Sequence, residues 1–218
     1  MKPALIRIAL VGMALLSMNG PCGSAELSAG GRIGLNVSAI FGDTVQGLTP
    51  RFGFNVGLYT TQWLNEKLGL QEELVIDMRG ERWTSDPSAL MSYSNYATNF
   101  TYLDIPLLVK WRFVNNDALR PSLYLGPTFA FPLIAQAEYM GNTKDMLEQT
   151  NRFDFDVTAG FSLDIRRGNA FIPIDVRYIL GLTNFAKASD YNAHVTHGVF
   201  SISVGLGSLL DFQKHKEF

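Results

Sequence analysis

The sequence predicts an all-β protein: an eight-stranded antiparallel up-and-down transmembrane β-barrel. Residues 100–113 alternate apolar and polar side chains over a length that exceeds the roughly nine to eleven residues a tilted strand needs to cross a bilayer. Seven other stretches alternate in the same way, and the connections between them are short and long in turn. Beyond the N-terminus no apolar run approaches the roughly 18 to 20 residues of a membrane helix, so any spanning segments must be strands.

The strands are expected in order along most of the chain. Glu72 interrupts the apolar face of the third strand, which implies a rim position or a bulge there. Pro121, Pro127 and Pro173 each lack a ladder donor, so the pattern leaves the strand register near them open. The eight expected strands cover approximately residues 28–41, 51–59, 68–79, 100–113, 119–129, 153–166, 172–180 and 200–212.

The connections indicate the orientation. Outer-membrane barrels have short periplasmic turns at one rim and longer extracellular loops at the other. Short turns are expected at 65–67, 115–117 and 167–169, and long loops at 42–50, 81–99, 132–151 and 183–196. Aromatic residues near the strand ends are typical of two interfacial girdles. The periplasmic girdle would hold Trp63, Trp111 and Phe113, and the outer one Phe41, Phe52, Phe100, Phe129 and Phe153.

The first 25 residues have the pattern of a secretory signal peptide. Lys2 and Arg7 precede an apolar stretch, and Gly23-Ser24-Ala25 offers small residues for cleavage. The barrel domain is then 26–218. Cys22, the single cysteine, would be removed with the signal, which excludes disulfides and thiolate metal sites in the mature chain. The net charge of −2 does not suggest nucleic-acid binding.

The two faces of the predicted strands differ in charge. A soluble barrel of the lipocalin type would turn the apolar face inward, but that face carries bulky residues on nearly every strand, more than an eight-stranded interior can hold with a ligand. The other face balances seven positive against seven negative side chains, as a narrow interior requires. The expected lumen charge network is Arg32, Arg51, Arg79, Lys110, Arg112, Arg120 and Arg177 with Glu73, Asp77, Asp104, Asp154, Asp156, Asp164 and Asp175.

Four segments resemble the PorT-like outer-membrane β-barrel family, which is common in the Gram-negative Bacteroidota. They are residues 102–110 (YLDIPLLVK), 120–127 (RPSLYLGP), 159–164 (AGFSLD) and 175–184 (DVRYILGLTN). The resemblance implies an eight-stranded barrel in the cell outer membrane and implies little about activity, because most relatives are simply porin-like. Outer-membrane barrels usually end in an alternating apolar stretch closed by an aromatic residue. Phe218 is in place here, but Lys214 and Lys216 interrupt the alternation.

An enzymatic reading depends on the last long loop. His194 and Asp190 could act there as general base and orienting carboxylate, with Tyr191 nearby. Such residues are ordinary in loops, and no nucleophile motif accompanies them. Asp154 and Asp156 face the same way and could bind a cation, although pairing with arginine or lysine is the favoured reading. No cofactor, metal site or catalytic residue is therefore predicted.

The sequence favours a non-enzymatic barrel with a structural or interaction role. Its expected partners are outer-membrane lipid and an extracellular or periplasmic protein bound through the loops, chiefly 81–99 and 132–151. Tyr93, Tyr96, Tyr139 and Tyr191 are the expected contact residues. A narrow porin or ion channel, a lipid- or peptide-modifying enzyme and a soluble lipocalin-like carrier are the alternatives. An eight-stranded interior is just filled by side chains, so a porin would need the charged network to rearrange.

Overall fold

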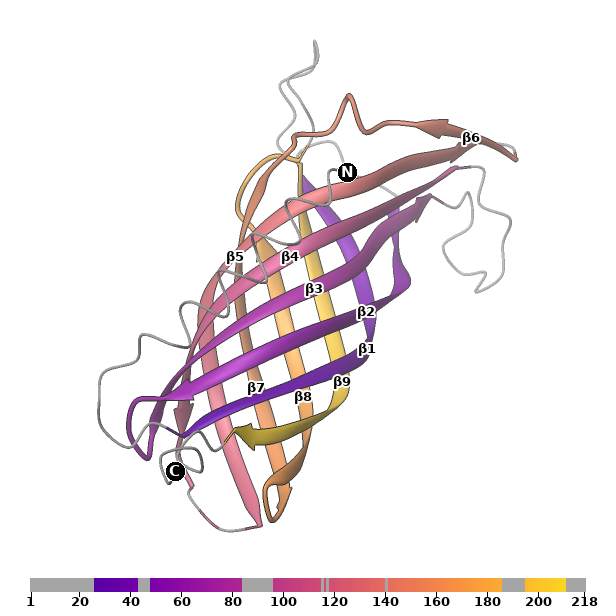
Figure 1. Cartoon of the computed structure of the whole chain (residues 1–218). Helices are drawn as coiled ribbons and strands as arrows, with labels where there is room; N and C mark the ends of the chain where they lie inside the picture. The colour runs from indigo at the N-terminus through magenta and orange to yellow at the C-terminus, as the bar shows by residue number, and fades with distance from the viewer. Residues whose placement is uncertain are drawn as a thin grey trace, which may run out of the picture.

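The computed structural model describes residues 26–42, 48–83, 96–114, 116, 118–139, 141–185 and 195–210. The predicted signal peptide and the C-terminal Phe218 lie outside these residues. No helix among the described residues is long and apolar enough to cross a membrane. The strands in Figure 1 are β1 (Leu27–Gly42), β2 (Leu48–Trp63), β3 (Leu68–Trp83), β4 (Tyr96–Arg112), β5 (Leu119–Tyr139), β6 (Asn142–Asp145), β7 (Asp154–Arg167), β8 (Ala170–Gly181) and β9 (Val195–Leu210).

Eight of these strands close into a barrel. Antiparallel neighbours follow in the order β4-β3-β2-β1-β9-β8-β7-β5, and β4 pairs with β5 to complete the ring. The first and last strands pair along their full length, from Leu27 opposite Leu210 to Gly42 opposite Val195. The ring therefore has no free edge, and the predicted fold class is confirmed. We call the end with the short turns the periplasmic end, following the rule for such barrels.

The apolar face of the barrel points outward. Ile33, Phe54 and Leu206 are 63%, 65% and 71% exposed, and comparable apolar side chains cover the outside of every strand of the ring. Most of the charged residues of the same strands are buried inside. This arrangement suits lipid outside the barrel and is the reverse of a soluble barrel that carries an apolar ligand.

Two aromatic residues expected in the interfacial girdles lie inside the barrel instead. Trp111 and Phe113 are exposed at the periplasmic end, as expected for girdle residues, but Trp63 and Phe100 are only 4% and 5% exposed. The cause is strand parity: Phe100 shares the inward face with Tyr102, since alternate residues of a strand point the same way. The position of a residue in the alternation, and not its closeness to the rim, therefore decides whether its side chain points inward or outward.

The long loop predicted for 132–151 is wrong in its first half. β5 continues to Tyr139, the chain turns at Gly141, and β6 returns along β5. This β5–β6 hairpin extends past the ring at the upper end of Figure 1. The sequence pattern did not reveal this hairpin because β5 contains a bulge. Thr101 pairs with Ile134 and Tyr102 with Pro132, so Leu133 is an extra residue, and the inward and outward positions of β5 exchange there. Loop 81–99 is also shorter than expected, because β3 reaches Trp83 and β4 begins at Tyr96.

The structure gives the register at the other irregular positions. Glu72 lies in regular pairing, opposite Thr60 on one side and Leu107 on the other, so no bulge accompanies it. The irregularity in that sheet region lies instead in β2, between Pro50 and Asn55. The three prolines that left the register open are in regular pairing: Pro121 is opposite Leu163, Pro127 opposite Val157, and Pro173 opposite Asp164.

Candidate functional site: the charged lumen

The expected network residues all lie on strands of the ring. Arg51 and Arg120 are partly exposed. The others are buried: Arg32, Glu73, Asp77, Arg79, Asp104, Lys110, Arg112, Asp154, Asp156, Asp164, Asp175 and Arg177. Because buried charge must be compensated, the positions of the partners decide what this interior can do.

A four-residue network crosses the middle of the lumen. Arg32 of β1 lies 2.7 Å from Glu73 of β3 and 3.4 Å from Asp175 of β8. Arg177 approaches the same two carboxylates at 2.9 and 2.8 Å. The Tyr124 hydroxyl donates a hydrogen bond of 2.7 Å to Asp175. Two guanidinium groups thus meet two carboxylates, and this layer is electrically neutral.

The next layer toward the outer end is acidic. Arg79 of β3 pairs with Asp77 at 2.8 Å and with Asp156 of β7 at 2.9 Å, and it also pairs with Asp104 of β4. Its guanidinium carbon lies 4.7 Å from the centre of the Tyr102 ring. One arginine therefore holds three carboxylates from three strands in a buried space.

An apolar cluster lies beyond Arg79 at the outer end of the lumen. The Tyr102 hydroxyl donates a hydrogen bond of 2.9 Å to Asp154 and lies 3.2 Å from His197. The His197 ring stacks on Phe185 with the ring centres 4.2 Å apart. We define the outer cap by its apolar members, which come from strand ends and from the segments after β6 and β8: Ile40, Phe100, Ala130, Ala135, Met146, Leu147, Phe185 and Val195.

The periplasmic end of the lumen is basic. Glu26 binds Arg120 at 3.0 Å and lies 3.7 Å from Arg112 and from Arg166. The Arg112 guanidinium also lies over the Trp63 ring, 3.6 Å from its centre. We call Glu26 and these three arginines the periplasmic mouth.

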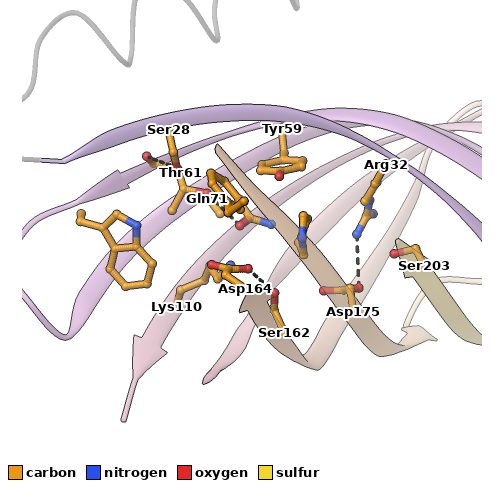
Figure 2. Close-up of a pocket in the computed structure, with 13 residues that line it drawn as sticks. Ser28, Arg32, Tyr59, Thr61, Gln71, Lys110, Ser162, Asp164, Asp175 and Ser203 are labelled. Carbon is orange, nitrogen blue, oxygen red and sulfur yellow. Dashed lines mark hydrogen bonds and ion pairs between the residues drawn. The ribbon is translucent and has the colours of Figure 1, made fainter. Parts of the chain in front are cut away.

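Small cavities continue inward from the mouth. One lumen cavity in the described part of the chain has about 20 Å³ of room, enough for one water molecule. Figure 2 shows Lys110 and Asp164 pointing into it, with Arg32 paired to Asp175 at its inner end. A cavity of about 10 Å³ lies at the mouth, and another of about 10 Å³ lies beside Asp77 and Asp104. The periplasmic half therefore has room for scattered water rather than for a solute.

The charges are unevenly distributed along the lumen. The outer layer sets Arg79 against four acids, namely Asp77, Asp104, Asp154 and Asp156. Among the described residues, the periplasmic end has more bases than acids, with Lys110, Arg112, Arg120 and Arg166 near Glu26 and Asp164. Glu26 and Arg166 were absent from the predicted network, although Arg166 shares the alternation of Asp164.

The structure offers limited material for catalysis. Asp190 and His194, the candidate catalytic pair, lie outside the described residues, as does Tyr191. Within the described residues no group of three histidine, cysteine, aspartate or glutamate side chains could hold a metal ion. Asp154 and Asp156, considered for a cation, are engaged by Tyr102 and Arg79 respectively.

A closed ring of eight antiparallel strands, apolar outside and ion-paired inside, defines an outer-membrane β-barrel protein. The protein is accordingly located in the outer membrane. The chain belongs to the outer membrane protein beta-barrel domain family, whose sequence model matches residues 19–187.

Solved structures of similar fold come from several bacteria. Neisserial surface protein A (NspA) has a TM-score of 0.56 at 12% identity, over 86% of this chain and 100% of that one. OprG from Pseudomonas aeruginosa has a TM-score of 0.52 at 14% identity, over 85% and 96%. Ail, the attachment invasion locus protein of Yersinia pestis, has a TM-score of 0.45 at 18% identity, over 84% and 99%. No curated protein sequence matches the chain. At these identities, the similarity to NspA and OprG concerns the fold alone.

Proposed function

We propose that the protein is a closed, non-enzymatic outer-membrane barrel that acts as a structural or interaction protein through its extracellular side. The observation that carries this proposal is the filling of the lumen. The Arg79 and Arg32 networks cross it, and the outer cap packs over them. Passage of a solute would require several buried ion pairs to separate at once, which is costly.

The β5–β6 hairpin is the favoured contact surface. Tyr139 is 56% exposed near its tip, and all four residues of β6 are exposed. Exposed tyrosines contribute strongly to protein interfaces, which supports a role for Tyr139. The roles proposed for Tyr93 and Tyr191 concern residues outside the described part of the chain. Tyr96 begins β4 and pairs with Tyr139 near the tip of the hairpin.

Cross-linking from the hairpin tests the interaction role. With the predicted removal of Cys22, a Thr143→Cys substitution introduces a single thiol that can carry a photo-cross-linker on intact cells. We expect adducts of discrete size, because Thr143 is exposed on β6. The control is Asn169→Cys in the β7–β8 turn, which an impermeant reagent should leave unlabelled. Absence of adducts from Thr143→Cys, with the barrel folded, would contradict the proposal.

A narrow porin is the second candidate, and the chain of small cavities in the periplasmic half favours it. Planar bilayer recordings separate the two candidates. We expect the wild-type protein to give no stepwise conductance, because the Arg79 layer and the outer cap lie in series. A porin would give steps that increase when Asp104→Asn weakens that layer. Stepwise conductance of the wild-type protein would contradict our proposal and support a porin.

The finer family assignment is also a proposal. The similarity of residues 102–110 and 175–184 to PorT-like barrels supports membership of that group and an origin in the Bacteroidota. The group is named after a secretion-linked member, and this role is not carried over to the chain. We infer a non-enzymatic role because most of the buried carboxylates of the lumen are occupied by arginine and tyrosine partners.

A further inference from the structure

The periplasmic mouth concentrates guanidinium groups around too few acceptor atoms. One oxygen of Glu26 is shared by Arg112 and Arg120, and the other lies 3.1 Å from Arg120 and 3.7 Å from Arg166. The arginine side chains are no more than 11% exposed, so water compensates them poorly. A single carboxylate cannot offer good geometry to three planar donors.

Two of these arginines have donors without an acceptor. The Nε atoms of Arg112 and Arg166 are buried and have no hydrogen-bond partner among the described residues. The Arg120 Nε, by contrast, donates to the backbone oxygen of Asn116. Buried donors without a partner are unusual in native proteins and indicate that no described residue supplies the acceptor that these two donors need.

Nearby acids do not remove the imbalance. Asp164 lines the mouth cavity but accepts its hydrogen bond from Ser162, and it lies within 4 Å of none of the described basic groups. Lys110 is 4% exposed and lies deeper in the lumen, where it forms no ion pair with a described residue. Counted over the described residues, the periplasmic end of the lumen is therefore positive even when Asp164 is included.

The mouth is accessible from the periplasm. Glu26 is 32% exposed, and the small cavity beside it is lined by Arg112, Arg120 and Arg166. A phosphate that approaches from the periplasm would have to displace the Glu26 carboxylate, because the cavity beside it has only about 10 Å³ of room. The site therefore joins buried positive charge with an open side, which the deeper layers do not have.

We propose that the periplasmic mouth binds a phosphate group between Arg112, Arg120 and Arg166. A phosphate offers more acceptor oxygens than the two of Glu26, and guanidinium groups bind phosphate oxygens in pairs of hydrogen bonds. The phosphate could come from free phosphate in the periplasm or from a lipid head group of the periplasmic leaflet. Both sources present the same chemistry to the three arginines.

Calorimetric titration of the full mature chain in a non-ionic, phosphate-free detergent tests this site. The probes are inorganic phosphate and a short-chain phosphatidic acid. We expect the Arg112→Gln, Arg166→Gln double variant to bind phosphate about tenfold more weakly, or worse, because charged hydrogen bonds are lost. The control is the Lys67→Gln, Arg167→Gln double variant, which removes the same charge from exposed residues at the periplasmic end of the barrel. It should stay within about twofold of the wild type.

A second variant keeps the proposal testable if the double variant does not fold. Glu26→Gln removes the competing carboxylate, so phosphate binding should tighten. Unchanged or weaker binding by Glu26→Gln would overturn the proposal, as would absent binding by the wild type or equal losses in the two double variants. Tighter binding of phosphatidic acid than of inorganic phosphate would identify a lipid head group as the source, and equal binding would identify free phosphate.

Discussion

The Arg79→Ala variant is expected to lose at least about 3 to 5 kcal/mol of unfolding free energy, the usual cost of removing one partner from a buried ion pair. The substitution leaves Asp77, Asp104 and Asp156 without their shared cation. Each of them is at most 2% exposed, so water cannot replace the guanidinium. Urea unfolding of the protein in lipid vesicles, followed by the boiling-dependent gel shift of folded barrels, measures the loss.

Arg82→Ala is the matched control for this prediction. Arg82 lies three residues further along β3 but is exposed, so its removal should change the unfolding free energy by no more than about 0.5 kcal/mol. Adding Asp104→Asn and Asp156→Asn to Arg79→Ala should recover part of the stability, because fewer unpaired charges remain buried. If Arg79→Ala is as stable as the control, the acidic layer does not depend on its arginine.

The Leu35→Arg variant is expected to lose about 2 to 4 kcal/mol in a bilayer, the cost of an outward arginine near the membrane midplane. Leu35 is 60% exposed and lies eight residues from the start of β1, near the middle of that 16-residue strand. The same vesicle unfolding assay measures the effect.

A substitution at the rim shows whether the cost of an outward arginine depends on its depth in the membrane. Leu210→Arg places the same charge at the periplasmic end of β9, opposite Leu27, where the expected cost falls to about 0 to 1 kcal/mol. Equal costs at Leu35 and Leu210 would contradict the depth assigned to the strands. A gain of stability at Leu35 would mean that this face does not contact lipid.

Sequence patterns predicted the strands because a period of two reports directly on the two faces of a strand. The alternation predicts strands over residues 100–113 and 153–166, which form most of β4 and β7, and the buried charged residues of these strands lie in the lumen. The pattern failed where the period changed. The extra residue Leu133 concealed the β5–β6 hairpin, and Trp63 was assigned by closeness to the rim instead of by parity.

The grouping of the lumen charges could not be predicted. Equal numbers of acids and bases in the sequence suggested local neutralisation, but Arg79 alone meets three acids while three arginines share Glu26. These groups form across strands that are distant in the chain, as between Arg79 and Asp156. The layer in which each charge lies depends on strand stagger, which no local pattern specifies.

By itself, the sequence determined the barrel, its strand number and the face that meets lipid, because side-chain alternation is a local property of each strand. The tertiary structure alone decided the outer cap, the projecting hairpin and the separation of an acidic outer layer from a basic periplasmic mouth. Those features depend on the register between strands, where shifting one strand against its neighbour moves each charge along the barrel axis and gives it different partners.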